Sequence, residues 1–153
     1  MTAQSDSRDI EVVEKLLAAR YSCRAFKPDP VPREIIERVL SAAQKTASWC
    51  NSQPWQVTIF SGDAVKAFGE AMYKAASERA PPVTDFDFPR EYKGVYLDRR
   101  RESGFQLYNA LGIPRGDKAG YNKQMLENFR FFGAPHVAII TSDEALGTYG
   151  AID

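Results

Sequence analysis

The sequence predicts a domain of the α+β class in which helices outnumber strands. Three observations support this prediction: apolar side chains recur at helical spacing in about five segments, two short runs are typical of strands, and the composition is that of an ordinary soluble domain. Of the 153 residues, 44% are hydrophobic and 26% are charged. We therefore expect one domain over residues 1–153, which buries about two thirds of the surface that its unfolded chain exposes.

Two amphipathic helices are expected in the N-terminal part. Apolar side chains recur at helical spacing through residues 10–17, with charged residues between them, and predict a first helix that ends near Arg20. Pro32 suits a first helical position, and an apolar stripe follows it. A second helix is therefore expected to begin at Pro32 and to end before Ser48.

Two strands are predicted, one from Trp55 to Phe60 and one from Val137 to Thr141, because both runs are rich in β-branched or aromatic residues. Helical patterning places further helices at about 65–75, 92–111 and 118–129, and residues 81–89 form a proline-rich surface connection. A two-stranded sheet is marginal, since typical sheets have about five or six strands. We therefore expect either an incomplete chain or a second subunit that completes the sheet.

Charge and cysteine content exclude several classes of protein. Lys plus Arg and Asp plus Glu both number 20, so the chain has no electrostatic footprint for nucleic acid or anionic lipid. No apolar run reaches the roughly 18 residues of a spanning helix, and the polar residues 1–9, expected to be frayed, exclude a signal or transit peptide. Cys23 and Cys50 have no metal-binding spacing and are expected as free thiols in a reducing cytoplasm.

The single histidine, His136, belongs to a run that is typical of a buried strand, so a Ser-His-Asp site is not expected. A cluster of different chemistry lies at the end of the first helix, where Arg20, Ser22 and Arg24 follow one another closely. Two guanidiniums with a hydroxyl between them suit a phosphate, because arginine forms bidentate charge-assisted hydrogen bonds. The alternative is a pair of surface arginines that bond helix-end carbonyls, and spacing alone favours that alternative.

A second polar cluster precedes the first strand. Its members are Ser48, Asn51 and Gln53, which stand just ahead of Pro54-Trp55. Amides both donate and accept, so such a loop can bind the polar edge of a planar ligand. A network of side-chain caps that only holds the loop together is an equally good interpretation.

Three segments taken together resemble the nitroreductase family of flavin enzymes. They are RYSCRAF from Arg20, PVPREIIERVLSAAQ from Pro30 and SWCNSQPWQVTIF from Ser48. The family shows an Arg-x-Ser-x-Arg loop, a Pro-x-Glu helix start and a Ser-x-x-Asn-x-Gln-Pro-Trp loop in this order. The later NFRFFGAPHVAII is similar to the family's central strand with its lead-in, and LYNALGIPRGD is similar to members that reduce nitroaromatic acids such as nitrobenzoates.

This resemblance implies an α+β fold with a mainly antiparallel central sheet flanked by helices. It also implies an intertwined homodimer that holds FMN in a cleft between the two subunits. Chains of the family normally continue beyond the region that matches Asp153 and supply further strands and flavin contacts, so this chain is expected to be incomplete at its C-terminus.

The resemblance also assigns roles to the two polar clusters. Arg20 and Ser22 match the positions that hold the FMN phosphate and ribityl chain, and Arg24 the position near the ribityl chain and the pyrimidine edge of the flavin. The loop that reaches the flavin of the other subunit is matched by Ser48, Asn51 and Gln53. A cation near that edge favours the reduced flavin, whose charge it stabilises.

The implied activity is transfer of a hydride from NAD(P)H through flavin N5 to a nitroaromatic or quinone-like acceptor by a ping-pong mechanism. Because the flavin carries the chemistry, no catalytic side chain and no metal are expected. Candidates to line the acceptor slot are Trp49, Tyr108, Phe129, Phe131 and Phe132, although core packing is the favoured interpretation for the last four. Other possibilities are dehalogenation or flavin fragmentation on the same fold, or a catalytically silent module for flavin binding or dimerisation.

Overall fold

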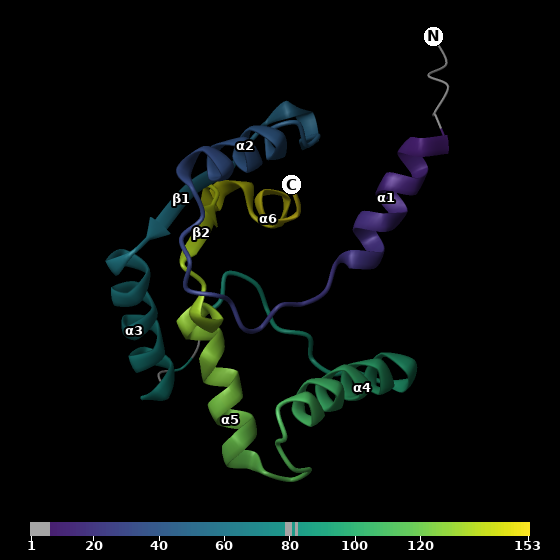
Figure 1. The fold of residues 1–153 in the computed structure, drawn as a ribbon, viewed down its shortest axis with the longest axis vertical. Helices are drawn as coiled ribbons and strands as arrows, with labels where there is room; N and C mark the ends of the chain where they lie inside the picture. Colours follow the sequence, from purple (N-terminus) through teal and green to yellow (C-terminus); the bar gives the residue numbers. More distant parts are fainter. Residues whose placement is uncertain (1–6, 79–80, 82) are drawn as a thin grey trace.

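The computed structural model describes residues 7–78, 81 and 83–153 (Figure 1). The helices of this described part are α1 (Ser7–Ala19), α2 (Arg33–Ala43), α3 (Asp63–Ser77), α4 (Gly94–Ala110), α5 (Lys118–Leu126) and α6 (Thr148–Ile152). Its short 3₁₀-helices are η1 (Trp49–Asn51), η2 (Glu127–Gly133) and η3 (Glu144–Leu146), and its strands are β1 (Gln56–Ser61) and β2 (His136–Thr141). None of the helices in these residues is long and apolar enough to cross a membrane.

The predicted helices and strands are confirmed to within a few residues. The predicted helix through residue 129 ends earlier, at Leu126, where η2 takes over. The connection predicted at 81–89 contains no helix or strand at its described positions, and residue 82 lies outside them. Of the start predicted to be frayed, residues 1–6 lie outside the described part, whereas residues 7–9 already belong to α1.

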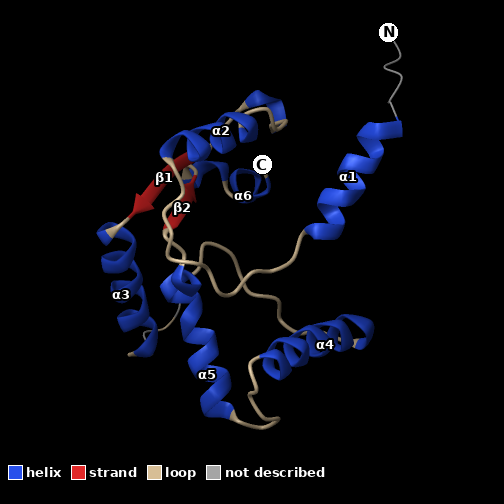
Figure 2. Cartoon of the chain, viewed as in Figure 1, coloured by secondary structure: helices blue, strands red, loops and turns tan. Residues whose placement is uncertain are grey.

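The two strands form an antiparallel pair (Figure 2). Gln56 pairs with Thr141 at one end of the ladder, and Ser61 pairs with His136 at the other. In the described residues no third strand joins this pair, so both of its outer edges are open. The α+β class is therefore confirmed, with a sheet as small as the sequence predicts.

The small core lies where α3 packs against η2, β1 and α5. The ring of Phe68 stacks on Phe60 with centroids 4.8 Å apart and contacts Phe131 at 5.4 Å. Val65 and Leu126, 6% and 7% exposed, are the two hydrophobic residues that are buried in the described part. Burial of apolar surface at this junction holds α3 and α5 beside the sheet.

The predicted burial of two thirds of the unfolded surface is wrong. The protein exposes 13282 Å², whereas a compact monomer of this size exposes about 7,700 Å² and its unfolded chain about 25,000 Å². Slightly less than half of the unfolded surface is therefore buried. The physical reason is that some helices pack little against the rest of the described residues: Figure 1 shows α1 standing apart from the sheet, and its Leu16 and Leu17 are both 66% exposed.

Replacing Leu126 by alanine is expected to lower the free energy of unfolding by about 2 to 4 kcal/mol, since it opens a cavity in the packed junction. Urea unfolding followed by circular dichroism measures this loss. Met125→Ala is the matched control, because Met125 is the neighbour of Leu126 on α5 and is 46% exposed. This substitution should lower the free energy of unfolding by less than about 1 kcal/mol. Equal losses in the two variants would show that the junction is not the stabilising core.

Candidate functional site

The first predicted cluster is open to solvent. The Arg20 N–H donates to Leu16 O at 3.1 Å, which closes the last turn of α1, and the Arg20 side chain is exposed at the start of the loop. Arg24 Nη1 donates to Ser22 O at 3.4 Å, a carbonyl of the loop and not of the helix end. Within the part of the chain that the structure describes, no carboxylate pairs with the guanidinium of Arg20 or Arg24. Two guanidiniums without a carboxylate partner therefore stand on either side of Ser22 in the sequence.

The loop that carries these arginines is anchored further along by His136. The Val31 N–H donates to His136 Nε2 at 2.8 Å, so this nitrogen carries no proton. His136 Nδ1 must then hold the proton, which it directs at Ser61 Oγ at 2.8 Å. Phe26 N–H adds a bond to Phe132 O at 3.1 Å. The loop is thus tied to β2, to the end of β1 and to η2.

The same geometry excludes His136 as the base of a nucleophilic serine. Ser61 lies within hydrogen-bonding distance of the ring, but the ring donates to its hydroxyl and accepts a backbone N–H with the other nitrogen. A general base needs a free nitrogen that faces the hydroxyl. The role of His136 in the structure is therefore to hold the loop.

The second predicted cluster forms one hydrogen-bonded loop. Ser48 Oγ accepts from the Gln53 N–H at 2.8 Å, and Gln53 Nε2 donates to Asn51 Oδ1 at 2.7 Å. The structure thus brings Ser48, Asn51 and Gln53 together, and the network of caps that the sequence left open is present. This network leaves the Asn51 amide nitrogen and the Gln53 amide oxygen without a bond to another described residue.

The backbone of this loop is strained. Cys50, Asn51 and Gln53 have φ values of 51°, 56° and 45°, in the left-handed region. Asn tolerates that region, whereas Cys and Gln are each destabilised there by about 1 kcal/mol or more of conformational free energy. Such strain persists only where surrounding contacts fix the chain, and it is concentrated at ligand-binding sites.

An acidic residue that the sequence did not single out fixes the loop from outside. Asp153 Oδ2 accepts from Ser48 Oγ at 2.5 Å, and Asp153 Oδ1 accepts from the Trp49 N–H at 2.5 Å. The bond from the Ser48 hydroxyl, followed by that from the Trp49 N–H, lowers the pKa of the Asp153 carboxyl. The sequence carries no signal for this contact, because Ser48 and Asp153 are 105 positions apart.

The predicted acceptor-slot aromatics divide into two groups. Tyr108 stacks on Tyr121 with centroids 4.1 Å apart, and Phe131 packs on Phe68, so both rings contribute to packing within the chain. Phe129 and Phe132 are half-buried in η2. Trp49, in contrast, is 66% exposed on the strained loop. Its ring is the best placed of the five to meet a ligand bound at that loop.

The two polar clusters do not form a single closed site within one chain. Arg20–Arg24 precedes α2, and Ser48–Gln53 follows it (Figure 1). Among the described residues, no hydrogen bond or ion pair joins one cluster to the other. A ligand that contacts both clusters therefore has to connect two segments that no described hydrogen bond or ion pair joins.

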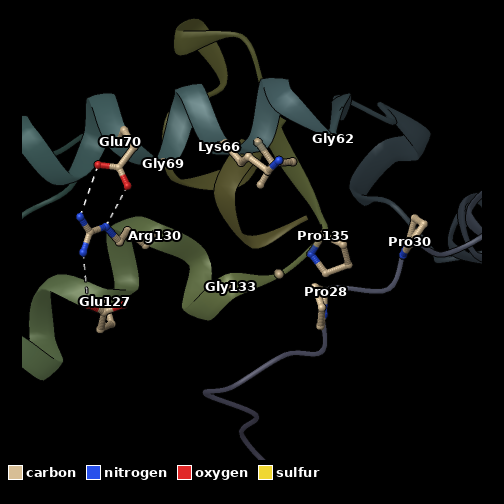
Figure 3. A pocket seen from close by; sticks show the side chains of 12 residues that line it. Pro28, Pro30, Gly62, Lys66, Gly69, Glu70, Glu127, Arg130, Gly133 and Pro135 are labelled. Atoms are coloured by element: carbon tan, nitrogen blue, oxygen red, sulfur yellow. Dashed lines mark hydrogen bonds and ion pairs between the residues drawn. The ribbon is translucent and has the colours of Figure 1, made fainter.

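A separate pocket of about 530 Å³ opens between α3, η2 and the loop before α2. Figure 3 shows Arg130 at one side of it, between Glu70 and Glu127. Arg130 donates to the Glu70 carboxylate at 3.1 and 3.3 Å, which raises the pKa of the guanidinium, and its charge lies 3.6 Å from the centre of the Tyr73 ring. The opposite wall carries Pro28, Pro30 and Pro135. Because this arginine is already paired and no predicted site residue lines the pocket, it is not the candidate site.

Comparisons with known proteins find matches that cover most of this chain. The family model described as "Nitroreductase family" matches residues 17–152. Nitroreductase NfnB of Mycolicibacterium smegmatis is 41% identical over 136 residues, which cover 85% of this chain and 56% of that protein. Nitrobenzene nitroreductase of Ectopseudomonas oleovorans is 36% identical over 137 residues, which cover 88% of this chain and 60% of that protein.

A solved structure is similar as well. The crystal structure of the FMN-dependent nitroreductase NfnB from Mycobacterium smegmatis in complex with NADPH superposes with a TM-score of 0.84 at 35% identity. The match covers 93% of this chain and 64% of that one. The chain thus spans somewhat more than half the length of the relatives that it matches.

Proposed function

Since this chain belongs to the nitroreductase family and shares the fold of its solved members, we propose that the protein is an FMN-dependent oxidoreductase. It passes a hydride from NAD(P)H to a nitroaromatic or quinone-like acceptor. The observation that carries the proposal is the pair of uncompensated guanidiniums at Arg20 and Arg24, with the Ser22 hydroxyl between them. Relatives whose names state nitroreductase activity support the reaction class.

The donor set of the first cluster fits the phosphate end of FMN. That group carries nearly two negative charges and several strong acceptor oxygens, which two guanidiniums neutralise with bidentate hydrogen bonds. The Ser22 side chain adds a short neutral bond. In the part of the chain that the structure describes, no carboxylate pairs with Arg20 or Arg24, and Arg24 donates to the Ser22 carbonyl at 3.4 Å, so no internal anion competes with the phosphate.

The second cluster fits the pyrimidine edge of the flavin ring. That edge presents an N–H donor between carbonyl acceptors, and the strained loop offers the Asn51 amide nitrogen as a donor and the Gln53 amide oxygen as an acceptor. When bound, FMN supplies hydride acceptance and delivery at N5. The side chains of the protein hold and orient that group, and Arg24 places positive charge near the edge where negative charge develops.

We assign the acceptor slot to the surface beside Trp49. A wide, exposed indole face stacks well on an electron-poor aromatic ring. The sequence has no Gly-x-Gly-x-x-Gly motif after a strand, so the nicotinamide is expected to use the same slot as the acceptor. Two substrates that share one slot must bind in turn, which is the ping-pong order. The free thiols of Cys23 and Cys50 suit a reducing cytoplasm that keeps NAD(P)H available.

A homodimer is part of this proposal. The apolar side of α1 is open, with Ile10, Val13, Leu16 and Leu17 each more than half exposed. Exposed apolar surface on this scale marks a protein contact. A second copy that covers α1 would bury it and would bring the Ser48–Gln53 loop of one subunit to the arginine cluster of the other. This arrangement explains why the two clusters are not joined within one chain.

The direct test is a purified preparation reconstituted with FMN. We expect flavin absorbance to stay with the protein through desalting, to bleach when NADPH or NADH is added without oxygen, and to return when 4-nitrobenzoate is supplied. Free FMN at the same concentration, with the same donor and acceptor, is the control. A protein that binds FMN but is never bleached is a flavin-binding module, and one that takes up no FMN contradicts the proposal altogether.

A further inference from the structure

We propose that Asp153 is a positioning residue that holds the Ser48–Gln53 loop in the conformation that binds the pyrimidine edge of the flavin. This inference rests on the proposed function, since it deepens the account of the same cofactor site. Asp153 itself touches neither the flavin nor the substrate in this scheme. It acts on the cofactor through Ser48 and Trp49.

The carboxylate of Asp153 spans two adjacent residues of the loop. Its Oδ2 accepts from the Ser48 hydroxyl and its Oδ1 accepts from the Trp49 N–H, both at 2.5 Å. A carboxylate that uses both oxygens on neighbouring donors fixes the direction of the chain between them, because the two bonds together restrict rotation about the loop backbone. The side chain is only partly exposed, so this contact is a built part of the fold.

The effect reaches the residue that is proposed to meet the flavin. A hydroxyl has one proton, and Ser48 donates it in the hydrogen bond to Asp153. The lone pairs of Ser48 Oγ are therefore free to accept from the Gln53 N–H at 2.8 Å. Gln53 then lies in the left-handed region, with φ 45°, and donates its side-chain amide to Asn51. Asp153 thus orients Ser48, Ser48 holds the Gln53 backbone, and Gln53 positions the amides. This order explains how a strained loop keeps one conformation.

A second contact joins the same two segments. The Trp49 and Tyr149 rings lie with centroids 5.9 Å apart and their planes inclined by 36°. Tyr149 and Asp153 are carried by α6 and the residue that follows it. The segment therefore holds the loop by a carboxylate on one side and by an aromatic ring on the other, and it sets the direction of the exposed indole in the proposed acceptor slot.

The experiment compares Asp153→Asn and Asp153→Ala with a matched control in the same segment. Asp143 is that control: its Oδ1 accepts from the nearby Ala145 N–H at 2.8 Å, and among the described residues no hydrogen bond joins it to the Ser48–Gln53 loop. An asparagine at 153 has a single acceptor oxygen and no charge, so it cannot accept from both the Ser48 hydroxyl and the Trp49 N–H as the carboxylate does. We expect FMN to dissociate about tenfold more readily from Asp153→Asn and at least as readily from Asp153→Ala, with Asp143→Asn unchanged.

Two readouts separate positioning from a loss of general stability. Hydrogen exchange of the Trp49 amide should accelerate in both variants at position 153 while the amides of β1 and β2 keep their protection. In steady-state kinetics on the flavin-loaded protein, the KM for the nitroaromatic should rise more than kcat falls, because the indole loses its fixed direction.

The outcomes are distinguishable from those that test the function. If unaltered protein takes up no FMN, the proposed function is wrong, and exchange of the Trp49 amide still decides whether Asp153 fixes the loop. If unaltered protein binds FMN and the variants bind it equally well, with the Trp49 amide still protected, the positioning role of Asp153 is overturned. A uniform rise in exchange over both strands would equally contradict it, since that result signals global unfolding.

Discussion

Replacing Arg20 by alanine is expected to weaken FMN binding by roughly 100-fold. Hydrogen bonds between charged partners contribute about 1.5 to 3 kcal/mol, and a tenfold change in affinity corresponds to about 1.4 kcal/mol. The effect is large because the structure leaves the Arg20 charge unpaired by any other described residue, so no internal partner competes with the phosphate. Titration of the apoprotein with FMN, followed by quenching of flavin fluorescence, measures the dissociation constant.

Two companion variants sharpen this test. Arg101→Ala removes the same charge from an exposed position on α4 and should leave FMN affinity unchanged at moderate salt. Arg20→Lys keeps the charge but loses the planar fork, and should give an intermediate dissociation constant. If Arg20→Ala binds FMN as tightly as Arg101→Ala does, Arg20 does not hold the phosphate.

The double variant Leu16→Glu with Leu17→Glu is expected to convert the proposed dimer to a monomer at micromolar concentration. Both side chains are 66% exposed in one chain, so charge there costs little before association. In an interface the double variant would force two carboxylates into an apolar contact, which costs several kcal/mol of association free energy. At about 1.4 kcal/mol per tenfold change, the affinity of the two subunits falls by two orders of magnitude or more. Sedimentation velocity over a range of concentrations reports the change.

Lys15→Glu is the matched control for this second prediction. It alters the net charge by the same amount, on the same helix, without touching the apolar side chains. We expect it to sediment as unaltered protein does. A double variant that still forms the dimer would show that α1 lies outside the interface, and the open apolar surface would then need another explanation.

Local order was predictable from the sequence because it depends on near neighbours. The helical spacing of apolar residues predicted α1 and α2, and the run of β-branched residues predicted β2, each within a few residues of its observed bounds. The bend after α5 was not predictable: Phe131 and Phe132 have φ values of 55° and 52°, a conformation that bulky residues avoid. Tertiary contacts select it, since the Phe131 ring reaches Phe68 and the Phe132 carbonyl accepts from Phe26.

The candidate site shows the same division. Residue type and spacing marked Arg20, Ser22 and Arg24 as a candidate phosphate site with surface arginines as the favoured alternative, and the resemblance to the family then implied their role at FMN. Asp153 stayed hidden, since a carboxylate 105 positions from Ser48 becomes informative only after the chain has folded. The predicted degree of burial was also wrong, because length gives the surface that a compact monomer would bury and says nothing of helices such as α1 that lie away from the rest.

The imidazole of His136 acts as a noncovalent cross-link between three distant parts of the polypeptide. It joins Val31 to the paired ends of both strands, and the bond from the Phe26 N–H to the Phe132 carbonyl holds the same loop at a second point. A loop that is held at two points samples fewer conformations than a free one, so part of the entropy cost of ordering it is met during folding. Binding of an anion at this loop therefore requires less additional ordering of the chain, which is the advantage of a preorganised receptor.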